Sequence, residues 1–556
     1  MTILKKFDIK KYKCLPTPRK YQAEIIPKIV DAFNKKKYVI LEAPTGIGKS
    51  FIAATLGNYY AEKSTEDLQY GTYILVHQKI LQDQYVDEKW SHIDTNSGKI
   101  SSVYSADNYI CHCLKHLGIS CAEVAGLRKK DTNICPRDRC TYTMARKEFI
   151  DSPLGVTNIQ YFMNMASYTK LLMYKKLLVI DEAHNIENAV MNFVSTDISE
   201  FLSVQRLKIR MPDYKNDTQM MEWIKSTYQP AVQEKKHQVD QLTSNLIDNQ
   251  NRTAEEEEDL TKKLQESDFW DKYLSRLNRT IHNWKSDLWV MDLSTTKTGY
   301  KILSLKPIVI DEYTHELLFN QAENILMMSA TILDKSAFCK NIGINEDSVE
   351  FFQLPSIFPP EKRPIYFLPA GSMSKSYIDY TLPVLTKTIS HILKQHPKEK
   401  GIIHCHTYRI AEYIKRHIDR KDNKRLLVHT SEDREAILQK HISSLEPTIL
   451  LTPSMSEGVD LKDDLSRFQI ICKIPYPFLG DKRVKLKMKL QPWWYSYQTV
   501  KLIVQSLGRS VRSVDDYAVS YILDEDFINI YNNNYKLFPD YILEAIDGLP
   551  KKMSNL

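Results

Sequence analysis

The sequence contains the stretch Ala43-Pro44-Thr45-Gly46-Ile47-Gly48-Lys49-Ser50, which decides the fold. An apolar run, YVILE at 38–42, precedes it, and a segment that suits a helix, FIAATLGNYYA at 51–61, follows it. A glycine-rich turn between a buried strand and a helix presents backbone N–H groups and the positive end of the helix dipole to an anion. The stretch therefore predicts a phosphate-binding loop at the edge of a parallel sheet.

Each residue type in this loop has a chemical role. The glycines let the backbone approach phosphate oxygens closely, Lys49 reaches the β- and γ-phosphates of a nucleoside triphosphate, and Ser50 offers a hydroxyl ligand for Mg²⁺. The first position is Ala43 instead of glycine, so the strict pattern is not met. We expect residues 43–50 to bind ATP phosphates, although the loop alone does not say how the energy is used.

Length and composition limit the class of protein. The chain has 556 residues, which predicts three or four domains. Hydrophobic residues make up 43% and charged residues 26%, the balance of a soluble globular protein. The formal net charge of +7 permits binding to a polyanion but does not argue for it. No apolar run is long enough to span a membrane and no secretory signal follows the first lysines, so we expect an intracellular protein.

Short apolar runs alternate with helical patterns in two blocks, which predicts two α/β units with parallel sheets. The runs that predict strands are YVILEA (38–43), TYILVH (72–77), KLLVIDEAH (176–184), ENILMMSAT (323–331), KGIIHCHT (400–407), PTILLTPS (447–454), FQIICKIP (468–475) and YAVSYIL (517–523). Between the blocks, residues 195–290 are polar and helical. There Glu258 and Lys262, like Asp259 and Lys263, have the i,i+4 order that supports a solvated helix.

Two further patterns complete the chemistry of the loop. Asp181 and Glu182 end an apolar strand, where Asp181 is expected to hold Mg²⁺ and Glu182 to orient and deprotonate the attacking water. Much later, residues 505–512 read QSLGRSVR. Arg509 and Arg512 lie three positions apart, so they share a helix face and are expected to reach the γ-phosphate from the second block.

Five of the nine cysteines fall within a short stretch, namely Cys111, Cys113, Cys121, Cys135 and Cys140. Without a secretory signal, such a cluster indicates a metal site before it indicates disulfides. Four thiolates suit a [4Fe–4S] cluster and also suit tetrahedral Zn²⁺, for which His112 or His116 is an alternative ligand. The spacing leaves both metals open.

The motifs occur in an order that resembles the superfamily 2 helicases of the DEAH type. Beyond the loop and the acidic pair at 181–184, the segments that carry the resemblance are Arg19–Gln22, Val76–Gln84, Met328–Thr331, Gly401–Thr407 and Thr452–Asp460. In the second of these, His77 stands where the family usually has threonine. The resemblance implies that Gln22 contacts adenine, that Gly458 and Asp460 face the nucleotide, and that Gln505 closes on the phosphates together with Arg509 and Arg512.

The cysteine stretch resembles the iron–sulfur branch of this family, the XPD/DinG-like helicases. The segments that match this branch are Asn108–Cys111, Cys135–Tyr142 and Val156–Asn158. The resemblance implies a [4Fe–4S] cluster on Cys111, Cys121, Cys135 and Cys140, with Cys113 as the spare thiol. It favours iron–sulfur over zinc.

The expected fold class is α/β, with two RecA-like motor domains and two insertions in the first. The expected boundaries are motor domain 1 at 1–100, 151–192 and 291–345, the iron–sulfur domain at 101–150, the helical arch at 193–290 and motor domain 2 at 346–556.

The function that the resemblance implies is an ATP-dependent DNA helicase that moves 5′→3′ on single-stranded DNA and opens forked DNA. We expect a monomer that uses ATP and Mg²⁺, without membrane association, in the cytoplasm near the nucleoid or in the host cytoplasm for a viral source. A translocase that does not separate strands is the alternative. A non-catalytic binding module is disfavoured by the intact Lys49, Asp181, Glu182 and Arg512.

Overall fold

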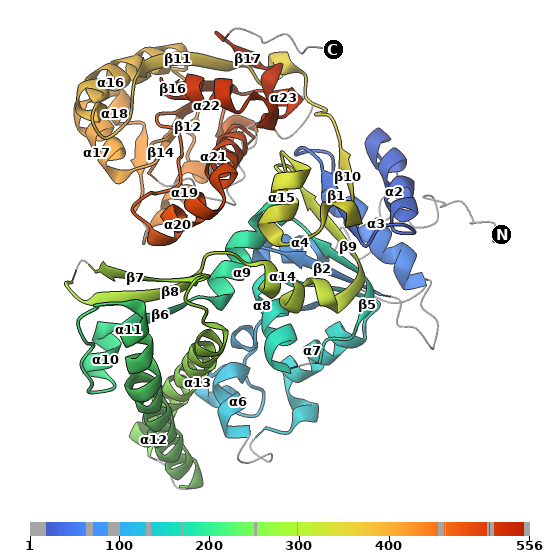
Figure 1. Ribbon diagram of the computed structural model, residues 1–556, viewed down its shortest axis with the longest axis vertical. Helices are drawn as coiled ribbons and strands as arrows, with labels where there is room; N and C mark the ends of the chain where they lie inside the picture. Colours follow the sequence, from blue (N-terminus) through green and yellow to red (C-terminus); the bar gives the residue numbers. More distant parts are fainter. Residues whose placement is uncertain are drawn as a thin grey trace, which may run out of the picture.

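The chain forms two α/β lobes, with two insertions in the first lobe (Figure 1). Each lobe is built on a seven-stranded sheet in which every pair of strands is parallel, so the predicted fold class is confirmed. The computed structural model describes residues 18–62, 71–86, 100–128, 135–169, 171–249, 253–296, 298–430, 432–453, 461, 463–508, 511 and 516–549.

The first sheet has the strand order β10-β1-β9-β5-β2-β4-β3. Its strands are β1 (Tyr38–Glu42), β2 (Thr72–Val76), β3 (Ser101–Val103), β4 (Leu154–Asn158), β5 (Lys175–Ile180), β9 (Ala322–Ser329) and β10 (Val349–Gln353). Alternate residues face opposite cores: Tyr38 and Ile40 pack into one buried cluster, and Val39 and Leu41 pack into the other. Because helices cover both faces, the central strands contain continuous apolar runs, as the sequence predicted.

The helices of the first lobe include those that follow the phosphate-binding loop and the acidic pair. They are α2 (Lys20–Ala32), α3 (Lys49–Glu62), α4 (Lys79–Val86), α7 (Thr141–Asp151), α8 (Ile159–Asn164), α9 (Ile186–Val194), α14 (Asp311–Leu317) and α15 (Lys335–Ile342).

The second sheet has the order β13-β14-β12-β15-β16-β11-β17. Its strands are β11 (Ile365–Gly371), β12 (Gly401–His404), β13 (Leu426–Val428), β14 (Ile449–Thr452), β15 (Phe468–Ile471), β16 (Val519–Asp524) and β17 (Ile546–Asp547). Its helices are α16 (Ile378–Gln395), α17 (Tyr408–His417), α18 (Arg420–Asn423), α19 (Arg434–Ser443), α20 (Lys482–Leu490), α21 (Pro492–Leu507), α22 (Phe527–Asn533) and α23 (Asp540–Leu543). Helices α20 and α21 lie on the side that faces the first lobe (Figure 1).

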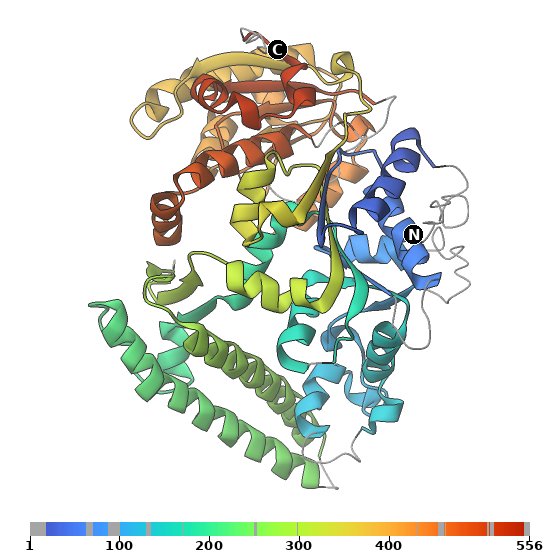
Figure 2. The same cartoon turned by 45° about the vertical axis from the view of Figure 1, so that its right-hand side comes forward.

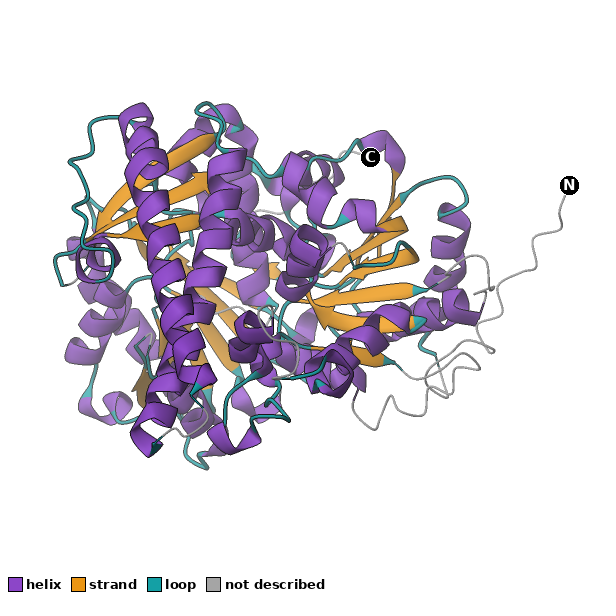
Figure 3. Cartoon of the chain, turned by 90° about the horizontal axis from the view of Figure 1, so that it is seen from below, coloured by secondary structure: helices purple, strands orange, loops and turns teal. Residues whose placement is uncertain are grey.

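The larger insertion is a pair of long helices on a small antiparallel sheet of order β6-β8-β7 (Figures 2 and 3). Its elements are β6 (Thr196–Ser199), α10 (Glu200–Gln205), α11 (Asp217–Trp223), α12 (Gln229–Asp248), α13 (Ala254–Asn283), β7 (Trp289–Thr295) and β8 (Lys301–Pro307). Thr253 and Glu256 form a capping box that starts α13, and Lys262 lies 2.7 Å from Glu258 as the i,i+4 pattern predicted. None of the described helices, these two included, is long and apolar enough to cross a lipid bilayer.

The smaller insertion carries the clustered cysteines. It contains α6 (Cys121–Arg128), which lies beside the end of α13 (Figure 2). Leu260 and Leu264 of α13 pack into the same buried cluster as the cysteines. The two insertions therefore support each other through a shared apolar core.

Strand pairing places three of the domain borders differently from the sequence boundaries. β3 (Ser101–Val103) belongs to the first sheet, although residue 101 was expected to open the iron–sulfur domain. β7 and β8 complete the sheet under the arch and therefore extend it beyond residue 290. β10 (Val349–Gln353) pairs with β1, so the first lobe continues beyond residue 345.

Candidate active site

The phosphate-binding loop lies between β1 and α3, as predicted. Gly46 and Gly48 have φ angles of +85° and +84°, a region that favours glycine. A Cβ atom on Gly48 would also lie 2.4 Å from Nε2 of Gln22, so a side chain there would displace the Gln22 amide. Nζ of Lys49 donates a 3.2 Å hydrogen bond to the carbonyl of Ala43, which holds the lysine over the turn.

Gln22 braces the loop from α2. Its Nε2 donates to the carbonyl of Ile47 at 2.7 Å, and its Oε1 accepts from the backbone N–H of Arg19 at 2.8 Å. The guanidinium of Arg19 donates to the carbonyl of Gly46. The expected contact of Gln22 with adenine stays a prediction; in the structure its buried amide fixes the shape of the loop.

The acidic pair follows β5. This strand lies in the same sheet as β1, and β9 lies between the two. The loop and the carboxylates therefore lie at the same carboxyl edge of parallel strands. Asp181 is buried, and burial followed by the neighbouring Glu182 raises its pKa to about 6, while Lys49 opposes the rise. Oδ1 of Asp181 accepts a 2.9 Å hydrogen bond from the N–H of Glu182.

Glu182 has a φ of +49°, a left-handed conformation that a residue with a side chain rarely adopts. Burial by itself raises the pKa of Glu182, but the charges of Lys49 and His184 outweigh it and keep the pKa below its ordinary value. Nδ1 of His184 lies 3.3 Å from Oε2 of Glu182. The carboxylate is therefore ionised at neutral pH.

His184 connects the acidic pair to the segment Ser329–Thr331 at the end of β9. Its Nδ1 lies 2.7 Å from Oγ of Ser329, and that same oxygen accepts a 3.0 Å hydrogen bond from the N–H of Thr331. From the second lobe, Nε2 of Gln505 donates to Oγ1 of Thr331 at 3.3 Å. Gln505, a predicted site residue, thus contacts the first lobe directly.

A cavity of about 270 Å³ lies between the lobes. Residues of the loop, the acidic pair and the second lobe all line it, among them Pro44, Thr45, Glu182, Thr331, Gln469 and Gln505. The structure thus brings three predicted residues of the first lobe, Pro44, Thr45 and Glu182, to the same cavity as Gln505. The predicted residues Gly458, Asp460, Arg509 and Arg512 lie outside the described residues, so their roles stay predictions.

Sequence reasoning missed Glu42, which lies directly before the loop and is buried. Its Oε1 accepts hydrogen bonds from the N–H groups of Ile332 and Leu333, both at 2.9 Å, and its Oε2 accepts from Nε2 of Gln353 at 2.9 Å. Burial raises the pKa of Glu42 to about 7. The signal was a single carboxylate ending an otherwise apolar strand.

The four cysteines predicted as ligands, Cys111, Cys121, Cys135 and Cys140, are gathered in one buried cluster. Cys113 is only partly buried at its edge. Sγ atoms approach within 3.8 Å in two pairs, Cys111 with Cys135 and Cys140 with Cys121, and no disulfide joins the described cysteines.

Within the described part of the chain, no three His, Cys, Asp or Glu side chains already form a metal-ligand cage. Two thiolates of one tetrahedral zinc ion, at about 2.3 Å from the metal, lie about 3.8 Å apart, which is the separation within each pair. Four buried thiols in one core also supply the donor set of a [4Fe–4S] cluster, which binds each thiolate to a different iron atom. The residues present fit either group.

Two family models match the chain. Residues 15–211 match the model described as type III restriction enzyme, res subunit, and residues 389–544 match the helicase C-terminal domain. The first match contains the phosphate-binding loop and the acidic pair, and the second contains Gln505. They therefore cover the two sides of the inter-lobe cavity.

One curated relative resembles the chain over nearly its whole length, and another resembles less than half of it. A probable ATP-dependent helicase of Methanocaldococcus jannaschii is 22% identical over 97% of this chain and 98% of the relative. The ATP-dependent DNA helicase DinG of Photobacterium profundum is 28% identical over 42% of this chain and 36% of the relative.

The fold itself resembles a solved XPD helicase, with a TM-score of 0.59 and 16% identity over 94% of this chain and 99% of that one. The two lobes, both insertions and the ordered motifs around the cleft agree with these matches. The chain therefore belongs to the XPD/DinG-like helicases of superfamily 2 and is an ATP-dependent helicase.

Proposed function

We propose that the chain is a DNA helicase that moves 5′→3′ along a single strand as a monomer and separates the duplex ahead of it. The observation that carries the proposal is the inter-lobe cavity, where Thr45, Glu182 and Gln505 meet. DNA as the substrate is supported by the relative DinG, a DNA helicase. Direction is supported by the resemblance to the iron–sulfur branch.

ATP would bind with its phosphates on the loop at 43–50. The N–H groups of the loop and the start of α3 face the phosphate oxygens, and Lys49 leaves the carbonyl of Ala43 to reach the β- and γ-phosphates. Ser50 and Asp181 would hold Mg²⁺, which neutralises charge on the phosphates. The second lobe would supply Gln505, Arg509 and Arg512.

Hydrolysis would proceed by attack of water on the γ-phosphorus. Glu182 orients the water and takes its proton while the bond between the γ-phosphorus and the β–γ bridging oxygen breaks, which gives ADP and phosphate. Loss of the γ-phosphate would remove the contacts that Gln505, Arg509 and Arg512 are expected to make with it, which would allow the cleft to open. Alternate closing and opening, with changing grip on the strand, would produce stepping.

The four buried cysteines would hold a [4Fe–4S] cluster, which would supply structural rigidity beside the arch. Support comes from the shared core of Cys111, Cys121, Cys135 and Cys140 with Leu260 and Leu264 of α13. Zinc remains the chemical alternative, and metal analysis of anaerobically purified protein separates the two.

The test of the proposal is an ATPase assay with and without single-stranded DNA, followed by strand displacement on forks with a 5′ or a 3′ tail. We expect ATP hydrolysis that single-stranded DNA stimulates, and displacement that requires a 5′ tail. Stimulated hydrolysis without displacement would identify a translocase instead. Absence of strand-stimulated hydrolysis would reject the proposal.

A further inference from the structure

One face of α21 lies against the first lobe along its whole length. Its residues at spacings of three or four positions form hydrogen bonds across the lobes. These bonds run from Trp494 Nε1 to Glu187 (3.1 Å), from Tyr497 OH to the carbonyl of Ile332 (2.9 Å), from Gln498 Nε2 to Glu187 (3.1 Å), from Lys501 Nζ to the carbonyl of His184 (3.3 Å) and from Gln505 Nε2 to Thr331 (3.3 Å).

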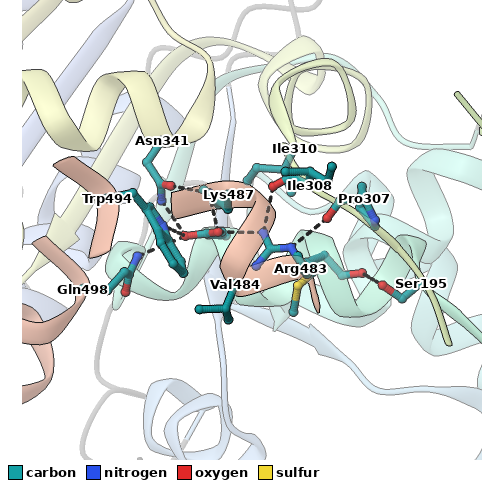
Figure 4. A network of polar contacts seen from close by, with 12 residues as sticks. Ser195, Pro307, Ile308, Ile310, Asn341, Arg483, Val484, Lys487, Trp494 and Gln498 are labelled. Carbon is teal, nitrogen blue, oxygen red and sulfur yellow. Dashed lines mark hydrogen bonds and ion pairs between the residues drawn. The ribbon is translucent and has the colours of Figure 1, made fainter. Parts of the chain in front are cut away.

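Near the start of α21, at the end away from Gln505, the contacts between the lobes centre on Glu187. It lies in α9, three positions after His184, and is 2% exposed. Besides the two donors from α21, its carboxylate accepts from Arg483 Nη2 at 2.8 Å and from Lys487 Nζ at 2.5 Å. Figure 4 shows Trp494, Gln498, Arg483 and Lys487 of the second lobe converging on one carboxylate.

The first lobe completes the surroundings of this carboxylate. Nδ2 of Asn341, from α15, donates to Glu187 at 2.9 Å, and its Oδ1 accepts from Lys487 at 2.8 Å. Nε of Arg483 donates to the carbonyl of Pro307 at 2.7 Å, at the end of β8 (Figure 4). Two buried cations thus form ion pairs with a single carboxylate, and removing it would leave Arg483 without its ion-pair partner and Lys487 with only the more distant charge of Asp311.

The two ends of α21 are therefore fixed differently. At one end, two donors from α21, Trp494 and Gln498, and two buried cations of the adjoining α20 bind Glu187 of α9. At the other end, Gln505 reaches the cavity through one hydrogen bond to Thr331, and the helix stops at Leu507. The Gln505 end of α21 is packed in the second lobe, where Gln469 donates to the carbonyl of Leu507, so the helix and this lobe are positioned together. The anchor at Glu187 therefore sets where Gln505 meets the loop and the acidic pair.

We propose that Glu187 is a positioning residue of the ATPase, which anchors α20 and α21 behind the acidic pair and so aligns Gln505 with the nucleotide. This inference rests on the proposed function, because alignment matters only if ATP is hydrolysed in the cleft. Glu187 does not line the cavity that Thr45, Glu182 and Gln505 line. It acts through α21, and its loss is expected to change turnover more than ATP binding, which the first lobe supplies.

The first experiment compares two single hydrogen bonds of the same helix. Gln498→Leu removes a bond across the lobes to Glu187, and Tyr495→Phe removes one to the carbonyl of Pro477 within the second lobe. We expect Gln498→Leu to lower strand-stimulated kcat about fivefold or more with KM for ATP within about twofold, and Tyr495→Phe to change neither. Equal losses in both variants, or a wild-type kcat in Gln498→Leu, would overturn the inference.

The second experiment uses the charges. Glu187→Gln is expected to lower kcat about twentyfold, and the double variant Glu187→Gln with Lys487→Met is expected to recover at least about fivefold of that loss. Recovery is expected because the net charge of the cluster returns to its original value and the amide oxygen can accept from Trp494 and Gln498. A double variant no better than Glu187→Gln would contradict a positioning role.

Hydrogen exchange tests the anchor without catalysis. In the full chain, Glu187→Gln and Gln498→Leu are expected to speed amide exchange within α21 while α3 exchanges as in the wild type. If the wild type hydrolyses no ATP, the proposed function fails, whereas unchanged exchange in α21 rejects the anchor itself. The two failures are therefore distinguishable.

Discussion

The amide of Gln505, in the second lobe, donates a 3.3 Å hydrogen bond to the hydroxyl of Thr331, in the first. Thr331 donates its backbone N–H to Ser329, and Ser329 lies 2.7 Å from the ring of His184. That ring in turn lies 3.3 Å from the carboxylate of Glu182. A chain of polar contacts thus leads from the second lobe to the residue expected to activate water.

This series of polar contacts predicts that Thr331 and Gln505 contribute to catalysis through one shared contact. Thr331→Val and Gln505→Ala are each expected to lower kcat about tenfold, because either change breaks the same contact across the cleft. The double variant is expected to lose little more than either single variant, which corresponds to a coupling of about 1 kcal/mol. Steady-state kinetics of the four proteins measure this coupling. Strictly additive losses of kcat would show that the contact between Thr331 and Gln505 does not couple the two lobes.

Lys49→Ala tests the phosphate-binding loop. The variant is expected to lose ATP hydrolysis by about a hundredfold or more, since it removes the cation placed over the β- and γ-phosphates. Binding of single-stranded DNA, measured by fluorescence anisotropy, is expected to stay largely intact. Lys28→Ala, an exposed lysine on α2, is the matched control. Wild-type hydrolysis in Lys49→Ala would remove the loop from the mechanism.

The central strands of both sheets were predictable because helices bury both their faces. β1, β2, β5 and β9 therefore each contain an unbroken apolar stretch, namely YVIL, YILV, LLVI and ILMM. β10 was not predicted: its residues VEFFQ are only partly buried, and its pairing of Val349 with Tyr38 joins segments far apart in the chain. No local pattern identifies such an edge strand.

The residues of the candidate site also fall into those that local sequence predicts and those that depend on contacts far apart in the chain. The loop at 43–50 and the acidic pair carry their chemistry in local spacing, so they were found from the sequence. Glu187 was not, because its partners Arg483 and Lys487 lie 296 and 300 residues away. For the cysteines, spacing gave the cluster but not the metal, since the same four thiols suit zinc and iron–sulfur.

Cysteine variants test the ligand set. Cys111→Ser is expected to lower bound iron and visible absorbance strongly, because Cys111 is fully buried beside Cys135. Cys113→Ser, two positions away and only partly buried, is the matched control and is expected to keep both. Iron and zinc are measured by elemental analysis after anaerobic purification. Zinc without iron in the wild type would show that the cysteines bind zinc and not an iron–sulfur cluster. Loss of bound metal in Cys113→Ser but not in Cys111→Ser would show that Cys113, and not Cys111, is the ligand.

The same Cys111→Ser protein tests whether the smaller insertion, which carries the clustered cysteines, helps to separate DNA strands. The insertion interrupts the first lobe and packs on α13 of the arch, so we expect its loss to reduce duplex unwinding more than ATP hydrolysis. Strand displacement and strand-stimulated ATPase are compared on the same preparation. Unwinding at the wild-type rate in protein without visible absorbance would show that the smaller insertion needs no cluster to separate the strands.

Glu42 makes stability depend on pH. Burial raises its pKa to about 7, above the value near 4.5 of an exposed glutamate. At pH values below about 4.5 the carboxyl is protonated in both the folded and the unfolded chain. As the pH rises towards 7 the unfolded chain releases its proton while the folded chain keeps it, so the folded state loses up to about 3 kcal/mol of relative stability.

Glu42→Gln removes this titration and isolates it from every other group. We therefore expect the wild type, compared with Glu42→Gln, to unfold at a relatively lower temperature at pH 8 than at pH 5. Calorimetry of both proteins at the two pH values measures the difference for the transition of the first lobe. A difference that does not change with pH would mean that Glu42 is ionised throughout, held by the N–H groups of Ile332 and Leu333 and by Gln353. The expected direction follows because three hydrogen bonds lower the pKa of this buried carboxyl less than burial raises it.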